Sequence, residues 1–373
     1  MARVLEILAR KQERNGNLPV EFDLREAESV DADIVLRAPN TSLYMVASEV
    51  RRAVFAELPP EVDITLAPFS RVAQFKHARR LIAVSFEELE RLAGSVPQPE
   101  QLIFFYNTAR SGTTLLHHML NRVDGVASLA EANFLVNLLW QRDVGKVEFG
   151  PATISDVLRW SLRMQAWHYA DRTLVFKLRN SEAQLLPLIN EVAPDSRRIM
   201  LYRDALAVGA SWKQQYSGWG WDRDYSVDEL GERFLVTPTT QDVLRRWLDA
   251  SPLSALPAEV AVLSMWIDGI VPYLEAEQRG VPFFTLRYDD LVAEPERMFR
   301  KLLTHLALPV DGIAHALGVL PEDSQAGTEM ARKRGRPNQT VLDTDEVRRI
   351  TEVLAMHPRK LAPDIVLPGT VSR

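Results

Sequence analysis

A hydroxyl-rich turn that interrupts an apolar run is the stretch of this sequence best suited to chemistry. Residues 102–107 are aromatic and aliphatic and predict a buried strand, while apolar residues from Leu115 to Val123 return at helical spacing. The turn between them reads Arg110, Ser111, Gly112, Thr113 and Thr114. A helix that begins there points free backbone N–H groups and the positive end of its dipole at the turn. The pattern favours a phosphate-binding turn, with an ordinary strand-to-helix connection as the alternative.

The turn differs from the loop of nucleoside triphosphatases, which reads Gly-x-x-x-x-Gly-Lys-Ser/Thr. When the second glycine of that motif is aligned on Gly112, Asn107 replaces the first glycine and Thr113 replaces the lysine, so ordinary ATP or GTP hydrolysis is disfavoured. A cation, Arg110, instead stands directly before Ser-Gly-Thr-Thr. This arrangement resembles the phosphosulfate-binding loop of the sulfotransferases that use 3′-phosphoadenosine 5′-phosphosulfate (PAPS). There a Lys or Arg precedes Ser-Gly-Thr-Thr, and the loop holds the 5′-phosphosulfate.

An arginine and a serine further along the chain indicate a second phosphate site. Residues 198–202 predict a buried strand, Arg203 follows it, and residues 205–215 predict a helix that carries Ser211. The arginine fork binds phosphate oxygens bidentately and stays charged. The pair resembles the 3′-phosphate site of the same family, which distinguishes PAPS from simpler adenylates. Taken singly, the two residues could be a surface arginine and an ordinary helical serine.

Two charged residues that follow other predicted strands are candidates for the transfer step. Glu131 comes shortly after a possible short strand at 126–128, and Lys177 lies near the end of a predicted strand at 173–178. Parallel sheets bind ligands at the carboxyl ends of their strands, so both side chains could face the same crevice as the turn. A buried lysine is also costly unless it meets an anion or water. The alternatives are a helix N-terminal acid for Glu131 and a lysine that reaches solvent for Lys177.

The resemblance implies roles for these two residues. In members similar to the tyrosylprotein and bacterial types, a Glu shortly after the loop and its helix is the general base, and Glu131 stands at that position. In the cytosolic hormone and phenol enzymes, the strand ends Lys-Thr-His, where the Lys touches the sulfuryl group and the His is the base. This chain keeps Lys177 but continues with Leu178 and Arg179. The missing His leaves the base role to Glu131 and makes Arg179 a possible further contact.

A tyrosine and a basic run complete the motifs. Residues 282–287 predict the last buried strand, and Tyr288 opens a segment similar to the family's Tyr-Glu-Asp-Leu, in which the Tyr borders the cofactor. A tyrosine that simply packs at a strand end is the alternative. The basic run at 332–336 resembles the family's Arg-Lys-Gly element only faintly, and a solvated basic loop explains it equally well.

The N-terminal hundred residues lack the alternation of strands and helices seen later. Short strands are predicted at 33–37 and 80–84, a helix over 43–58, and a capped helix opening at Ser85. The charged strip from Arg71 to Arg80 favours a solvated helix face over a binding patch. We interpret residues 1–97 as an N-terminal extension whose function the sequence does not indicate, and residues 98–373 as the sulfotransferase-like α/β domain.

The composition is that of an ordinary globular protein. The chain has 373 residues, 46% of them hydrophobic and 25% charged, and its net charge of −6 argues against nucleic acid as the main partner. The absence of cysteine excludes disulfides and thiolate metal sites, and adjacent His117 and His118 cannot share a helix face, so no metal is expected. No stretch has the length of a membrane span or the form of a signal peptide, which predicts a cytoplasmic protein.

These motifs together predict both a fold and an activity. Strands that alternate with helices indicate an α/β fold with a P-loop-like parallel sheet flanked by helices. The resemblance implies transfer of a sulfuryl group from PAPS to a hydroxyl or amine of an acceptor, taken to be a small molecule, with release of 3′,5′-ADP and without a metal. A phosphotransferase with an altered P-loop and a catalytically silent PAPS-binding module are the alternatives. The sequence does not indicate the acceptor or the oligomeric state.

Overall fold

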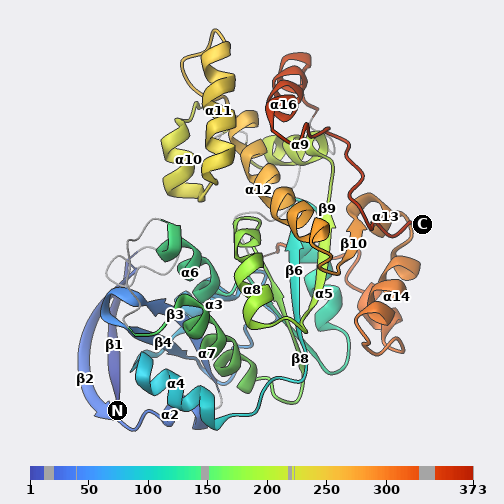
Figure 1. Cartoon of the computed structure of the whole chain (residues 1–373). Coiled ribbons are helices and arrows are strands. Elements are labelled where there is room, and N and C mark those ends of the chain that lie inside the picture. Colours follow the sequence, from blue (N-terminus) through green and yellow to red (C-terminus); the bar gives the residue numbers. More distant parts are fainter. Residues whose placement is uncertain are drawn as a thin grey trace. The chain divides into compact units, whose positions relative to one another are not determined.

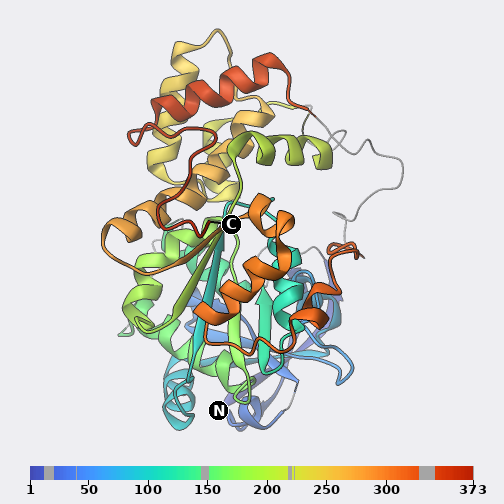
Figure 2. The same cartoon turned by 90° about the vertical axis from the view of Figure 1, so that its right-hand side faces the viewer.

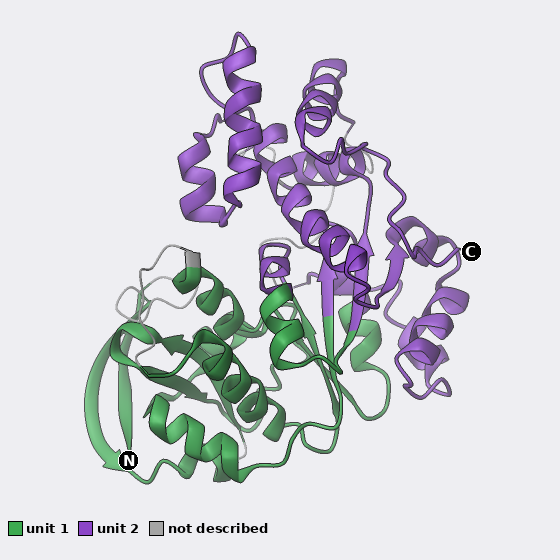
Figure 3. Cartoon of the chain, viewed as in Figure 1, with its two compact units in different colours: residues 1–104, 117–178, 187–197 green, residues 105–116, 179–186, 198–373 purple. Residues whose placement is uncertain are grey.

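The computed structural model divides into two compact units, which Figure 3 colours separately. Unit 1 comprises residues 1–104, 117–178 and 187–197, and unit 2 comprises residues 105–116, 179–186 and 198–373. Each unit is described by itself below. The structure describes residues 1–11, 21–38, 40–143, 151–216, 221, 223–326 and 341–372.

An antiparallel sheet makes up most of the N-terminal region (Figure 1). Among the described residues it has five strands in the order β2-β1-β5-β4-β3. The strands are β1 (Ala2–Arg10), β2 (Phe22–Val30), β3 (Thr41–Ala47), β4 (Arg52–Glu57) and β5 (Arg80–Ser85). The predicted strand at 80–84 is therefore confirmed as β5. The charged strip after β4 begins with a helix, α3 (Ser70–His77).

Two of the elements predicted in this region are wrong. Residues 43–58 form the hairpin of β3 and β4 in place of a helix, and Arg51 takes a left-handed φ of 50° at its turn. Because β3 is buried on both faces, its apolar residues follow one another without alternation, and the valines at 46, 50 and 54 imitate helical spacing. Residues 33–37 hold a short helix, α2 (Ile34–Arg37), in place of a strand.

Side-chain amides from two helices cover the free edge of β3. These helices are α6 (Asn133–Asp143) and α7 (Ile154–Trp167). Backbone N–H groups along β3 and its end donate to amide oxygens: Leu43 to Gln165 at 3.0 Å, Val46 to Asn137 at 2.9 Å, and Ser48 to Gln141 at 3.0 Å. An exposed edge strand can pair with other chains, and these bonds satisfy its backbone from within unit 1.

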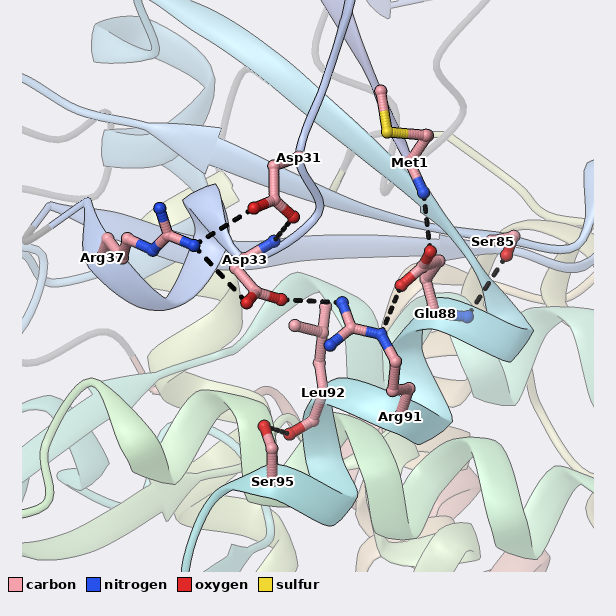
Figure 4. A network of polar contacts seen from close by, with 9 residues as sticks. All are labelled: Met1, Asp31, Asp33, Arg37, Ser85, Glu88, Arg91, Leu92 and Ser95. Carbon is pink, nitrogen blue, oxygen red and sulfur yellow. Dashed lines mark hydrogen bonds and ion pairs between the residues drawn. The ribbon is translucent and has the colours of Figure 1, made fainter.

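A network of exposed charges links α2 to the helix that follows β5 (Figure 4). That helix, α4 (Phe86–Ser95), is capped by Ser85, whose hydroxyl accepts from the backbone N–H of Glu88 at 3.2 Å, as predicted. Arg91 donates to Glu88 and to Asp33, each at 2.7 Å. The hydrogen bond from Arg91 holds the pKa of the Asp33 carboxyl below its ordinary value. Since these side chains are exposed, we assign the network little weight in stability.

A parallel sheet carries the predicted strand-and-helix pattern. It has five strands among the described residues, in the order β10-β9-β6-β8-β7. Its strands are β6 (Leu102–Asn107), β7 (Val126–Ala130), β8 (Thr173–Lys177), β9 (Arg197–Tyr202) and β10 (Phe284–Arg287). The β7–β8 pair lies in unit 1 and the β9–β10 pair in unit 2, and both pairs are parallel. The α/β fold with a parallel sheet flanked by helices is confirmed.

A helical segment follows each of these strands (Figure 1). They are α5 (Thr113–Asn121) after β6, α6 after β7, η2 (Ser181–Leu185) and α8 (Leu186–Val192) after β8, α9 (Ala205–Tyr216) after β9, and α13 (Tyr288–Ala293) and α14 (Pro295–His305) after β10. Residues 181–184, Ser-Glu-Ala-Gln, have the sequence form of a capping box, but they do not cap a helix. Asn180 is the N-cap, it makes no side-chain capping bond, and a 3-10 turn precedes α8.

Unit 2 also contains a group of helices in its C-terminal part. They are α10 (Val227–Phe234), α11 (Pro238–Ala250), α12 (Ala258–Gln278), α15 (Ile313–Leu317) and α16 (Thr344–Met356). The last of these packs against α9, α11 and α12 (Figure 2). In the part of the chain that the structure describes, no helix combines the length and the apolar character needed to span a membrane.

Candidate functional site

The hydroxyl-rich turn is a tight loop between β6 and α5. Ala109, Arg110 and Gly112 have φ angles of 54°, 45° and 80°. Two of these left-handed residues are not glycine, a conformation that costs of order 1 kcal/mol each and concentrates at functional sites. The side-chain oxygen of Asn107 accepts from the N–H of Ala109 at 2.8 Å, which closes the turn. The predicted strand, turn and helix are thus confirmed, with Thr113 and Thr114 in the first turn of α5.

Buried hydroxyl groups fasten this turn to the end of β9. The hydroxyl of Ser111 donates to the carbonyl of Leu201 at 3.2 Å, and the hydroxyl of Thr108 accepts from the N–H of Arg203 at 3.2 Å. Both side chains are fully buried. The hydroxyl of Ser111 therefore has a partner within the protein, and the start of the second motif is tied to the first.

Tyr288 packs against the glycine of the turn. A Cβ atom placed on Gly112 would lie 2.3 Å from a ring carbon of Tyr288, so the packing as well as the positive φ requires glycine here. The guanidinium carbon of Arg203 lies 4.8 Å from the centroid of the same ring, within range of a cation–π interaction. The hydroxyl-rich turn, the start of the Arg203–Ser211 motif and the Tyr288 segment therefore meet in unit 2.

The side chain of Arg110 reaches the helix of the second motif. Its Nε donates to the hydroxyl of Ser211 at 3.1 Å, and its guanidinium carbon lies 5.9 Å from the ring centroid of Trp212. We call Arg110, Gly112, Arg203, Ser211 and Tyr288 the loop cluster.

Helix α12 supports the loop cluster in a way that the sequence analysis missed. A Cβ atom on Gly269 would lie 2.7 Å from the carbonyl oxygen of Asn107, so glycine allows the helix to lie directly against the end of β6. The indole N–H of Trp266, one turn earlier, donates to the carbonyl of Arg203 at 2.8 Å. In the sequence, a glycine and a tryptophan inside an apolar helix do not indicate that the helix contacts β6 and the residue after β9.

Glu131 and Lys177 form a buried pair in unit 1. The parallel register sets Ala130 of β7 opposite Lys177 of β8, and the N–H of Glu131 donates to the carbonyl of Lys177 at 2.8 Å. The ammonium group of Lys177, whose side chain is 2% exposed, donates to Oε1 of Glu131 at 3.2 Å. Glu131 has a φ of 58°, a further left-handed non-glycine residue. The structure brings these two strand ends together, and their position at the same crevice as the turn stays a prediction.

The N-terminal region supplies further neighbours of this pair. Nε of Arg71 lies 3.9 Å from Oε2 of Glu131, and the ring centroid of Phe69 lies 5.4 Å from Nζ of Lys177. We call Phe69, Arg71, Glu131 and Lys177 the carboxylate cluster. The solvated helix face favoured for residues 71–80 therefore does not include Arg71, since sequence alone does not show which residues of α3 face β7.

The first of the two adjacent histidines of α5 has polar neighbours within unit 1. His117 is buried, its Nδ1 lies 2.8 Å from the hydroxyl of Ser128, and burial holds its pKa well below the ordinary value. Its ring is therefore neutral near pH 7. The described residues contain no group of three or more His, Asp or Glu side chains placed to hold a metal ion.

A family comparison agrees with this geometry. The model of a family described as the sulfotransferase family matches residues 103–312, more than half of the chain. The chain belongs to the sulfotransferase family. The match begins within β6 and includes Arg110, Glu131, Lys177, Arg203, Ser211 and Tyr288, whereas Phe69, Arg71 and the basic run at 332–336 lie outside it. The resemblance that the motifs indicated is confirmed, and family membership supports sulfuryl transfer as the general activity.

Solved sulfotransferase structures are similar to this family member at low sequence identity. One, from Alicyclobacillus acidocaldarius, has 11% identity and a TM-score of 0.41 over 71% of this chain and 94% of its own. A mouse sulfotransferase complexed with PAP has 14% identity and a TM-score of 0.40 over 73% of this chain and 90% of its own. One from Mycobacterium avium has 14% identity and a TM-score of 0.38 over 75% and 80%. No curated protein matches the chain significantly.

Two further candidate contacts of this sulfotransferase with substrate or cofactor stay predictions. Arg179 lies two residues before η2, and its N–H donates to Oε2 of Glu182 at 2.8 Å; a contact of its side chain with substrate stays a prediction. The basic run at 332–336 lies outside the described residues.

Proposed function

We propose that this protein transfers the sulfuryl group of PAPS to a hydroxyl or amine of a small acceptor and releases 3′,5′-ADP. The observation that carries the proposal is the contact between Arg110 and Ser211, which joins the anion-binding turn to the helix of the second motif. Family membership supports the general activity. We further propose PAPS as the donor, a hydroxyl or amine as the acceptor group, and the residue roles given below.

The donors of the loop cluster suit a ligand with two separate phosphate groups. The N-terminus of α5, which has no acidic residue in its first turn, and the side chain of Arg110 would hold the 5′-phosphosulfate. Arg203 and Ser211 would hold the 3′-phosphate, and Tyr288 would border the nucleotide. The positive charge in this cluster comes from arginine side chains, so the proposal assigns no metal.

The carboxylate cluster supplies the groups that the transfer step needs. The acceptor oxygen or nitrogen forms a bond to sulfur while the bond from sulfur to the bridging oxygen breaks, and that oxygen leaves with 3′,5′-ADP. Glu131 would take the acceptor proton, a role that requires hydrogen-bond reach. Lys177 would turn from the carboxylate to the sulfuryl oxygens and offset their charge in the transition state.

Binding of nucleotides tests the proposed 3′-phosphate site. By calorimetry, 3′,5′-ADP should bind about 10- to 100-fold more tightly than 5′-AMP, because a charged hydrogen-bond pair contributes of order 1.5–3 kcal/mol. Arg203→Ala should remove most of this preference. Arg279→Ala, which changes an exposed arginine at the end of α12, is the matched control.

Two outcomes would count against the assignment. Equal affinities of the wild-type protein for the two nucleotides would show that no group recognises the 3′-phosphate. Greater thermal stabilisation by ATP with magnesium than by 3′,5′-ADP would favour the phosphotransferase with an altered P-loop.

A further inference from the structure

A short segment outside the family match surrounds the proposed base. The match begins at residue 103, but residues 67–71 contact both strand ends of the carboxylate cluster within unit 1. The carbonyl of Ala67 lies 3.3 Å from Nε2 of His117, and the hydroxyl of Ser70 accepts from the N–H of Ala130 at 2.9 Å. The segment thus contacts the end of β7 and the helix α5, beyond the outer surface of the sheet.

The carboxylate of Glu131 lies between two cations that come from different parts of the chain. Lys177 of β8 contacts Oε1 at 3.2 Å, and Arg71 of α3 lies 3.9 Å from Oε2. The side chains are 2%, 22% and 15% exposed for Lys177, Arg71 and Glu131, so all three are largely shielded from water. Charge pairs with this degree of shielding are screened less by salt and constrain orientation more than surface pairs.

The backbone at Glu131 also needs outside support. A non-glycine residue with a φ of 58° is strained, and such strain persists only where the surroundings fix it. The N–H of Glu131 is fixed by the carbonyl of Lys177, and the preceding N–H of Ala130 is fixed by the hydroxyl of Ser70. The N-terminal region therefore contacts the residue before Glu131 as well as the carboxylate itself.

We propose that the segment Phe69–Arg71 is part of the transfer site and that Arg71 is a positioning residue for Glu131. Arg71 holds Oε2 while Lys177 holds Oε1, so that the carboxylate keeps its orientation when Lys177 turns to the sulfuryl group. This inference rests on the proposed function, in which Glu131 accepts the proton. It assigns to the N-terminal region a part in catalysis that the family match does not cover.

The neighbouring cation on the same helix provides a matched control. Lys76 is exposed and lies in the last turn of α3, whereas Arg71 faces β7. Lys76→Ala and Arg71→Ala each remove one positive charge from α3. An effect of net charge, or of a solvated helix face, would be the same in both variants.

The experiment measures steady-state transfer from PAPS labelled in the sulfuryl group by wild type, Arg71→Ala, Arg71→Lys and Lys76→Ala. The acceptors are 2-naphthol, a primary alcohol, an aliphatic amine, and water alone, so that a rate is measurable for at least one. Arg71→Ala should lower kcat about 10- to 100-fold, the effect expected of a misplaced catalytic group, with the KM for PAPS and the Kd for 3′,5′-ADP within about twofold. Arg71→Lys should restore part of kcat, and Lys76→Ala should match the wild type.

A double variant distinguishes positioning from a general structural role. In a Glu131→Gln background, Arg71→Ala should cause little further loss, because Arg71 acts through the carboxylate that is already disabled. Additive losses, or equal kcat for Arg71→Ala and Lys76→Ala, would overturn the inference while leaving the proposed function intact. Wild-type protein that binds no 3′,5′-ADP and transfers no sulfate to any acceptor would overturn both. Urea midpoints of all variants show whether a loss reflects unfolding, in which case Arg71→Lys decides.

Discussion

Glu131 combines three properties at the end of a strand. Its backbone is left-handed, its carboxylate is largely shielded, and Lys177 donates to it. Such strain costs of order 1–3 kcal/mol, and a purely structural glutamate at this position would be readily replaced by glycine or asparagine. The proposed role of Glu131 as the base gives a reason for keeping a glutamate in this strained position.

Glu131→Gln tests that explanation. Glutamine has the same length and can still accept the hydrogen bond from Lys177, but it cannot take a proton. The variant should bind 3′,5′-ADP within about twofold of the wild type and lose about 10²- to 10⁴-fold in transfer rate, the usual contribution of general base catalysis. Calorimetry and transfer of labelled sulfate measure the two effects. Glu90→Gln, an exposed site on α4, should change neither, and a Glu131→Gln enzyme with full turnover would move the base to another residue.

The motif residues could be predicted because they follow strands in a fixed order along the chain. A strand end brings its next residue to one edge of a parallel sheet, which is why Glu131 and Lys177, or Arg203 and the turn, could be expected to lie together. Arg71 and Trp266 could not be found in this way. Their positions depend on which face of a distant helix meets the sheet, and neither residue type nor spacing specifies that face.

At the scale of elements, a buried carboxylate joins α12 to the start of α11. Asp268 accepts from the N–H of Thr237 at 2.7 Å and from the hydroxyls of Thr237 and Thr240 at 2.8 and 2.6 Å. Thr237 is also the N-cap of α11. Burial raises the pKa of Asp268 to about 6, and the three hydrogen bonds offset that effect only in part. Its neighbour Gly269 lies against the carbonyl of Asn107, so α12 connects this carboxylate to the end of β6.

Because of this raised pKa, the contribution of Asp268 to the free energy of unfolding should fall as the pH rises from about 4 to 6. The folded state holds the proton of Asp268 more tightly than the unfolded state, whose pKa is near 3.8, so ionisation favours unfolding. Relative to Asp268→Asn, which stays neutral, the free energy of unfolding of the wild type should decrease by about 2 kcal/mol between pH 4.5 and 7. Urea titrations at the two pH values measure it. Asp249→Asn, exposed on α11, should show no such difference, and a constant gap for Asp268→Asn would mean that the carboxyl keeps an ordinary pKa.

Local signals predicted some elements correctly and misled at others. The helix opened by Ser85 was predicted correctly, because its capping serine fixes the first turn. The hairpin at 41–57 was misread because a strand buried on both faces has no alternation, and its regular valines satisfy a helical period equally well. Whether these residues form a strand or a helix depends on their burial in the folded protein, which the sequence does not show.

At the scale of the whole molecule, the N-terminal sheet shares a compact unit with part of the family match. Unit 1 joins residues 1–104 to 117–178, so the predicted boundary near residue 97 does not coincide with a break in packing. The division into residues 1–97 and 98–373 stays a prediction. The amide bonds from Asn137, Gln141 and Gln165 to β3 indicate what removal of the N-terminal region would expose.

A chain that begins at residue 98 should therefore fail to fold cooperatively. Without β3, the buried side chains of α6 and α7 would face water, and three side-chain amides would lose partners that each contribute of order 1 kcal/mol. We expect lower helical ellipticity, a broad thermal transition and self-association, measured by circular dichroism and size-exclusion chromatography. In the full chain, Asn137→Ala should lower stability by about 1–3 kcal/mol, whereas the exposed substitution Glu90→Ala should have little effect. A truncated chain that melts sharply, stays monomeric and binds 3′,5′-ADP with full affinity would instead establish residues 98–373 as an independent domain, because the edge of β3 would then be dispensable to the helices that cover it.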